Sequence, residues 1–248
     1  MLKYYKKMVN LIEKYNKYKI IICILTCNKN INRLEVIKKY WVNELYKYDI
    51  EFYFIISSKN IDDTYIDGNI LYVKLDETYE NLPKKMFCAY EYLYNNKTFE
   101  YIYKIDDDCV LNIDNMLSFN YQNYDYIGHD AGHDGFNRTW HYNKCDNPSL
   151  NITPYNKPYL GQWCAGGCGY YLSKKSVSII VKNKNFIFDE LYEDKAFGDI
   201  LRLNNIKPHF EINREQNKQC DNYKVCKFNN KYHDIDINDN ILLYDIFL

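Results

Sequence analysis

Short apolar runs alternate with segments of helical periodicity along this chain, and that alternation limits the possible folds more than any other feature. The runs at residues 19–27, 51–57, 69–75 and 100–105 have the pattern of buried strands. Apolar residues at helical spacing lie between them, at residues 32–47 and 82–94. Apolar strands separated by helices are typical of a sheet covered on both faces. We therefore predict an α/β fold with a mostly parallel sheet.

Shorter elements continue the pattern in the second half of the chain. Strands are predicted at residues 124–128 and 170–172, and helices at residues 173–181 and 193–203, with Ser173 as an N-cap. Residues 129–160 are polar, aromatic and rich in turn formers, which is too long for a plain connection, so we expect them to have a function or to be mobile. Residues 1–18 are predicted to form a helical lead-in, and no linker divides residues 19–248.

Composition and charge exclude several classes of function. The 248 residues have a net charge of -1, so no overall positive field favours nucleic acid, and we expect no such partner. No stretch is long and apolar enough for a membrane span, and the N-terminus lacks a signal-peptide apolar region. The nine cysteines are scattered and odd in number, which favours a reducing compartment over a disulfide framework, with structural zinc as a minor alternative. We expect a cytoplasmic protein.

Three consecutive carboxylates, Asp106, Asp107 and Asp108, directly follow the predicted strand at residues 100–105. Adjacent acids repel one another, and a hard cation removes that cost. Oxygen ligands suit Mg²⁺ or Mn²⁺, which keep open positions for phosphate. Because open α/β sheets bind ligands at the carboxyl ends of their strands, the triplet predicts a metal site. The alternative is an acidic surface turn.

Five blocks of the sequence resemble, in the same order, those of the β-1,3-glycosyltransferase family that includes β-1,3-galactosyltransferases and Fringe. They are N-R-L-E-V-I-K-K-Y-W at 32–41, E-T-Y-E-N-L-P-K-K at 77–85, Y-I-Y-K-I-D-D-D at 101–108, Y-L-G-Q-W-C-A-G-G-C-G-Y-Y-L-S at 159–173 and E-D-K-A-F-G at 193–198. The blocks run from Arg33 to Gly198, a span of about two thirds of the chain. The sequence departs from the family where Lys38 replaces an arginine, Glu77 an aspartate and Lys195 a valine.

The resemblance implies a single GT-A (Rossmann-like) domain with a mixed, mostly parallel sheet flanked by helices. It also implies an inverting, metal-dependent glycosyltransferase that moves a hexose or N-acetylhexosamine from a UDP-sugar, UDP-Gal or UDP-GlcNAc, to a hydroxyl of a glycan or glycosylated acceptor. A β-1,3 bond and Mn²⁺, with Mg²⁺ as an alternative ion, belong to that expectation. Two other functions stay open: an inactive nucleotide-sugar or carbohydrate-binding module, and a metal-dependent phosphohydrolase.

The resemblance assigns Asp108 to the metal and Asp106 to the nucleoside, with Asp106 as a further metal ligand. Glycines let the backbone approach a sugar, although a tight turn is the alternative. Arg33 and Lys38 could meet a diphosphate or could be solvated helix charges. Trp163 could stack on a sugar or pack in the core. The expected donor-binding residues are Thr26, Asn28, Arg33, Lys85, Asp106, Asp107, Trp163, Gly166 and Gly167.

Asp194 is the general base that the resemblance implies, with Glu193 as the second choice. Helix capping is the alternative, since a carboxylate is stabilised at a helix N-terminus. Lys195 beside it would lower the pKa of the base.

A histidine near the C-terminus completes the metal site in the family. His233 resembles that ligand and is preferred, and His209 is the alternative. Three further histidines fall in residues 129–160, where they contact solvent or acceptor, or form a second metal site. They are His129, His133 and His141.

Overall fold

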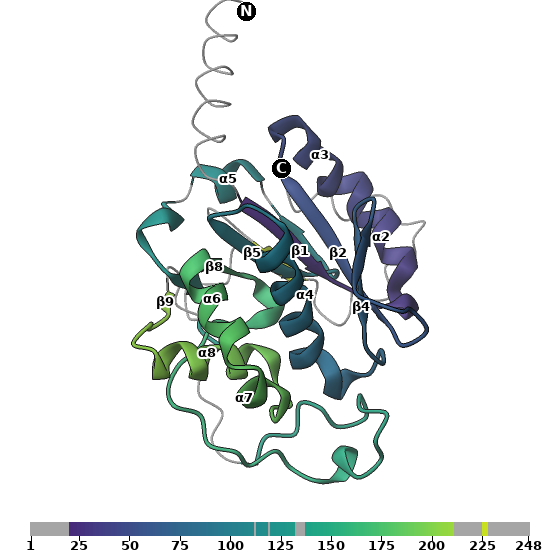
Figure 1. Ribbon diagram of the computed structural model, residues 1–248, viewed down its shortest axis with the longest axis vertical. Helices are drawn as coiled ribbons and strands as arrows, with labels where there is room; N and C mark the ends of the chain where they lie inside the picture. Colours follow the sequence, from purple (N-terminus) through teal and green to yellow (C-terminus); the bar gives the residue numbers. More distant parts are fainter. Residues whose placement is uncertain (1–19, 112, 119, 132–136, 211–224, 228–248) are drawn as a thin grey trace, which may run out of the picture.

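The protein is built around a mixed sheet of eight strands (Figure 1). The structure is a computed structural model, and it describes residues 20–111, 113–118, 120–131, 137–210 and 225–227. The strand order is β3-β4-β2-β1-β5-β8-β7-β9. The strands are β1 (Ile20–Leu25), β2 (Glu51–Ser58), β3 (Tyr65–Asp67), β4 (Ile70–Lys74), β5 (Tyr101–Asp106), β7 (Tyr126–Gly128), β8 (Tyr170–Ser173) and β9 (His209–Phe210). A separate pair joins β6 (Cys109–Leu111) to β10 (Val225–Lys227).

The centre of the sheet is parallel, as the sequence predicts. β1 pairs in parallel with both β2 and β5, and β2 with β4. The half beyond β5 is mixed, because β8 runs antiparallel to β5 and β7 while β9 is parallel to β7. The predicted mixed, helix-flanked α/β sheet is therefore confirmed. Leu25 at the end of β1 lies beside Asp106 in register, so two strand ends open at the same edge.

Helices cover both faces of the sheet, so the central strands are buried on both sides (Figure 1). Ile20, Ile22 and Ile24 pack in one core cluster, while Ile21 and Cys23 pack in the other. The first face carries α2 (Ile31–Ile37), a π-helical turn (Lys38–Val42), α3 (Asn43–Leu45) and α5 (Ile113–Ser118). The second face carries α4 (Leu82–Asn96), α6 (Lys174–Lys182), α7 (Lys184–Phe188) and α8 (Glu193–Leu203).

Short 3-10 helices form many of the connections. They are η1 (Asn28–Asn30), η3 (Tyr46–Tyr48), η4 (Tyr79–Asn81), η5 (Tyr121–Asn123), η6 (Leu150–Ile152) and η7 (Gly166–Cys168). The helix predicted at residues 32–47 is divided in this way into four consecutive helical pieces. Its predicted apolar face is nevertheless buried, since Leu34, Ile37, Trp41 and Leu45 all lie in one core cluster. The predicted lead-in at residues 1–18 lies outside the described residues.

Residues 137–160 form a layer of mostly irregular backbone that packs against η4 and against Tyr192, the residue before α8. In Figure 1 they run as a teal ribbon along the lower end of the molecule, below α7 and α8. A bridge between Arg138 and Tyr155 closes the layer on itself. The carboxylate of Glu80, in η4, accepts hydrogen bonds from the backbone of Asp146 and Asn147 at 3.1 and 3.0 Å. These contacts fix this layer against η4.

Candidate active site

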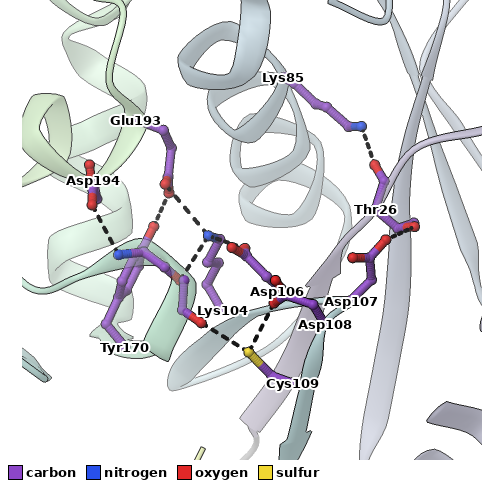
Figure 2. A network of polar contacts seen from close by, with 12 residues as sticks. Thr26, Lys85, Lys104, Asp106, Asp107, Asp108, Cys109, Tyr170, Glu193 and Asp194 are labelled. Atoms are coloured by element: carbon purple, nitrogen blue, oxygen red, sulfur yellow. Dashed lines mark hydrogen bonds and ion pairs between the residues drawn. The ribbon is translucent and has the colours of Figure 1, made fainter. Parts of the chain in front are cut away.

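The acidic triplet lies at the carboxyl end of β5, and its three side chains do not point the same way. Asp107 is buried, at 5% exposure, whereas Asp106 and Asp108 are partly exposed. Figure 2 shows Asp107 directed toward Thr26 and Asp106 toward Lys104, on opposite sides of the strand end. β5 ends at Asp106, and Asp107 and Asp108 lie in the turn that follows it, so the triplet divides into an inner acid and two outer ones.

The inner acid holds the polar groups that follow β1. Its carboxylate accepts hydrogen bonds from Thr26 Oγ1 at 2.7 Å and from Arg33 Nη1 at 3.0 Å. Burial raises the pKa of Asp107 above its ordinary value, against the opposing effect of Thr26 and Arg33. Three of the predicted donor-binding residues therefore contact one another, and Asn28 lies exposed nearby in the chain, in η1.

Lys104 links the outer acid to the start of α8. This lysine is only 1% exposed, and its Nζ lies 2.6 Å from Asp106 Oδ1 and 3.6 Å from Glu193 Oε2 (Figure 2). It also donates to the carbonyl of Gly166 at 3.0 Å. Burial alone would favour neutral lysine, but the carboxylates of Asp106 and Glu193 override it and raise the pKa of Lys104. One ammonium thus joins β5, η7 and α8.

The two acids that open α8 lie in different environments. Glu193 is buried, accepts a hydrogen bond from the Tyr170 hydroxyl, and has its pKa raised by burial to about 7 despite the nearby Lys104. Asp194 is half-buried, and its carboxylate accepts hydrogen bonds from Gly166 N at 3.0 Å and from its neighbour Lys195 N at 2.8 Å. Of the two predicted bases, Asp194 is the more accessible.

Gly166 in η7 and Gly169, which follows it, stand where a side chain would be unfavourable. A Cβ on Gly166 would lie 2.9 Å from Glu193 Oε2 and 3.2 Å from Lys104 Nζ. Gly169 has a φ of +87°, which disfavours any residue with a side chain. The Cys109 thiol lies 2.9 Å from the carbonyl of Gly167 and 3.3 Å from Asp108 Oδ1. The turn is therefore packed directly against the acidic triplet.

Lys85, one of the expected donor-binding residues, is buried, and its ammonium contacts protein groups. Its Nζ donates to the carbonyl of Thr26 at 2.5 Å and to Glu77 Oε1 at 2.7 Å. Glu77 in turn accepts from the backbone and hydroxyl of Ser57, at 2.8 and 3.2 Å. The pair ties α4 to the ends of β1 and β2, so Lys85 supports the loop that carries Thr26.

Trp163 is fully buried, which corresponds to the core-packing alternative. Its Cβ would lie 2.3 Å from a Cβ placed on Gly198 of α8, so that glycine provides the space for the tryptophan. The ammonium of Lys195 lies 3.1 Å from Glu190 and 3.0 Å from Asp199. These two carboxylates explain how a lysine is accommodated where the family has valine.

The histidines do not gather around the triplet within the part of the chain that the structure describes. His141 is buried, with its ring nitrogens 2.6 Å from the Tyr192 hydroxyl and 3.0 Å from the Thr153 carbonyl, so it is not solvent-facing. His129 is also buried. His209 lies in β9 and stacks on Tyr124. Two strands, β8 and β7, separate β9 from β5. The preferred ligand and one of the loop histidines, His233 and His133, lie outside the described residues.

A metal would have to be held here by few protein groups. Among the described residues, no cluster of three or more His, Cys, Asp and Glu side chains could hold a metal ion. Asp106 and Asp108 are nevertheless partly exposed oxygen donors at one strand end. Mg²⁺-type sites often use one or two carboxylates together with substrate phosphates. The residues present fit that kind of site.

The fold and the site together define an α/β domain with a carboxylate-lined site at the carboxyl edge of its sheet. Residues 32–211 match the Galactosyltransferase family. That match covers well over half of the sequence, and the chain belongs to this family, which makes it a glycosyltransferase by family. The predicted resemblance is confirmed.

Curated relatives match over a short segment. The chain is 39% identical over 49 residues to UDP-GalNAc:beta-1,3-N-acetylgalactosaminyltransferase 2 of Xenopus laevis, and 37% identical over 49 residues to the protein of the same name from Xenopus tropicalis. Each match covers 20% of this chain and 10% of the relative. The chain therefore spans about a tenth of the length of these relatives.

Solved structures of low similarity include a glycosyltransferase involved in the glycosylation of the major capsid of PBCV-1. It has a TM-score of 0.44 and 10% identity, with 81% of this chain and 84% of that chain covered. A putative glucose-1-phosphate thymidylyltransferase from Bacillus anthracis has a TM-score of 0.43 and 16% identity, with 78% and 87% covered. Within the described residues, no helix has the length and apolar character of a membrane span.

Two residues that contact the site, Lys104 and Tyr170, were not assigned from the sequence, nor was Tyr79, which packs against Tyr192 just before α8. Lys104 stands two residues before Asp106 on a buried strand, so both side chains face the same side, and a charge at such a position was a usable signal. Tyr79 and Tyr170 stand in the blocks at 77–85 and 159–173, but with 28 tyrosines along the chain neither was singled out.

Proposed function

We propose that this protein is an inverting, metal-dependent glycosyltransferase that transfers a hexose or N-acetylhexosamine from a UDP-sugar to a sugar hydroxyl. The match to the Galactosyltransferase family supports UDP-Gal as the donor, with UDP-GlcNAc as the alternative from the resemblance. The name of the curated relatives, beta-1,3-N-acetylgalactosaminyltransferase 2, supports a β-1,3 bond in the product. The main observation in its favour is the Lys104 ammonium, which lies between Asp106 at the end of β5 and Glu193 at the start of α8. The proposed donor-side acid and the proposed base helix are thereby held at one site.

Mn²⁺ or Mg²⁺ would be held by Asp108 and Asp106, and His233 remains the proposed third ligand. When bound, such an ion supplies a Lewis acid that stabilises the charge on the leaving diphosphate. Lys104 keeps Asp106 in place from the protein side, at 2.6 Å. The nucleoside would bind beside Asn28, Thr26 and Arg33. The last two are held by the buried carboxylate of Asp107.

Asp194 is the proposed base. It would accept the proton of the acceptor hydroxyl while that oxygen forms a bond to the anomeric carbon and the bond from that carbon to the UDP oxygen breaks. Two backbone N–H groups, of Gly166 and Lys195, hold the carboxylate in position. Because no enzymatic nucleophile takes part, the single displacement inverts the anomeric centre. Glu193 is less suited, since it is buried and bonded to Tyr170.

A donor screen tests the proposal. UDP-Gal, UDP-GlcNAc and UDP-GalNAc would each be incubated with Mn²⁺, with and without methyl β-D-galactopyranoside or methyl N-acetyl-β-D-glucosaminide, while UDP release is measured. We expect release that depends on Mn²⁺ and rises with acceptor, and a β-linked product by NMR. Calorimetric binding of UDP without any turnover would favour the binding module instead. Phosphate release from p-nitrophenyl phosphate without acceptor would favour the phosphohydrolase.

A further inference from the structure

Trp140 is the one tryptophan of this chain whose ring is substantially exposed. Its exposed fraction is 38%, while Trp41 and Trp163 are 2% and 0% exposed, and these are all three tryptophans of the sequence. Leaving a ring of this size in water forgoes the free energy of burying it. An exposed tryptophan close to a candidate active site is therefore a candidate ligand contact.

The position of Trp140 is fixed by its neighbours. Its ring lies 5.5 Å from the ring of Tyr192 at an angle of 53°. The next residue, His141, is buried and bonded to the Tyr192 hydroxyl at 2.6 Å. Arg138, two residues earlier, is buried with its guanidinium over the rings of Tyr155 and Tyr192, at 5.1 and 6.0 Å. Trp140 is thus presented by a packed support on both sides.

The support leads directly to the proposed base. Tyr192 is the N-cap residue of α8, so it immediately precedes Glu193 and Asp194. Tyr79 packs against the same aromatic cluster from η4. Burial is the main cause of the raised pKa of Tyr79, and the carboxylates of Asp194 and Asp106 add to it. Aromatic rings therefore extend from the site toward Trp140.

We propose that Trp140 is the stacking platform of an acceptor subsite for a pyranoside, with the ring of Tyr192 behind it. A pyranose has faces of C–H groups that pack well on an indole, while its hydroxyls stay in water or reach toward Asp194. The ring of Trp140 packs on Tyr192, and Asp194 follows Tyr192 by two residues in the first turn of α8. A sugar on this platform would therefore present a hydroxyl toward the start of α8. The inference rests on the proposed glycosyl transfer and adds where the acceptor binds.

Kinetics of matched variants test the platform. With methyl β-D-galactopyranoside and methyl N-acetyl-β-D-glucosaminide as acceptors, Trp140→Ala should raise the acceptor KM about tenfold, as expected for the loss of one stacking contact. The donor KM and the slow hydrolysis of donor without acceptor should not change, which also shows that the variant folds. Trp140→Phe should restore most of the acceptor affinity.

Tyr65→Ala is the matched control. Tyr65 is 42% exposed and stacks on Tyr72 with ring centroids 5.1 Å apart, but it lies in β3, at the far edge of the sheet. We expect its acceptor KM to equal that of the native protein. An unchanged acceptor KM in Trp140→Ala, or an equal rise in both variants, would overturn the platform.

Acrylamide quenching of tryptophan fluorescence gives a readout that does not depend on turnover. Since the other two tryptophans are buried, Trp140 should supply most of the quenchable emission. In the presence of UDP and Mn²⁺, the glycoside that serves as acceptor should protect this emission, and Trp140→Phe should remove both the quenching and the protection. An acceptor that is turned over without protecting the emission would refute the platform alone. If the native protein hydrolyses no donor and transfers to neither glycoside, the proposed function itself fails, and the platform with it.

Discussion

At the scale of single residues, adjacent acids in this protein are distinguished by their surroundings rather than by their type. Asp107 is buried between Thr26 and Arg33, while its neighbours are partly exposed. The sequence predicts a metal site at the triplet and a base at the start of α8, and both roles stay predictions. Which acid of each group is buried could not be predicted, because burial depends on the loop after β1 and on the turn of η7, both distant in sequence.

The raised pKa of Glu193 has a consequence for stability. Its carboxyl changes from an ordinary value of 4.5 to about 7 on folding, mainly because of burial. The folded state therefore binds this proton more tightly, so the stabilisation is complete below pH 4.5 and is lost as the pH rises through 7. In Glu193→Gln, urea unfolding should show a free energy of unfolding that falls less between these pH values than in the native protein, by on the order of 1–3 kcal/mol. Parallel pH profiles of the two proteins would contradict this account.

Lys104 is argued to be a positioning residue because it touches Asp106, Glu193 and the Gly166 carbonyl together. Lys104→Met should lower kcat at least tenfold while UDP binding weakens only modestly, and Lys104→Arg should recover part of kcat. Steady-state kinetics and calorimetry with UDP measure the two effects. A loss of stability with normal kcat would mean that Lys104 only supports the fold.

At the scale of elements, the sequence located α8 at its observed bounds, Glu193–Leu203, and the central strands within one or two residues. Those elements have strong periodicity and clear ends. The sequence did not indicate β3, with three residues, or β9, with two, because such short segments carry no period. The antiparallel direction of β8 also followed from no local pattern, since strand direction depends on the path of the preceding connection.

Lys195, which stands where the family has valine, is predicted to stabilise α8 through its two buried ion pairs. Lys195→Val would leave Glu190 and Asp199 buried without their shared ammonium, so the protein should lose about 3–5 kcal/mol of stability. Lys175→Val, which removes an exposed partner of Asp125, should cost less than about 1 kcal/mol. Urea denaturation of both variants measures the difference. Equal small losses would show that the buried cluster contributes little.

At the scale of the whole molecule, the proposed ligands bind the folded protein and not the unfolded chain, so they should stabilise the folded protein. UDP with Mn²⁺ at about a hundred times its Kd should add roughly 2.7 kcal/mol, which raises Tm by several degrees. Asp108→Asn should show no such rise with Mn²⁺ but should keep the Tm of the native protein without ligand. Differential scanning fluorimetry makes both measurements. An undiminished rise in Asp108→Asn would remove Asp108 from the metal site.

The central claim is that Asp194 removes the proton from the acceptor hydroxyl in a glycosyl transfer. The most direct test is the rate of transfer by Asp194→Asn, with UDP binding measured on the same sample. The account predicts that kcat falls at least 100-fold while the Kd for UDP and Mn²⁺ changes less than about threefold, since the amide cannot take the proton but keeps the shape of the carboxylate. Transfer at the native rate by Asp194→Asn would contradict the account.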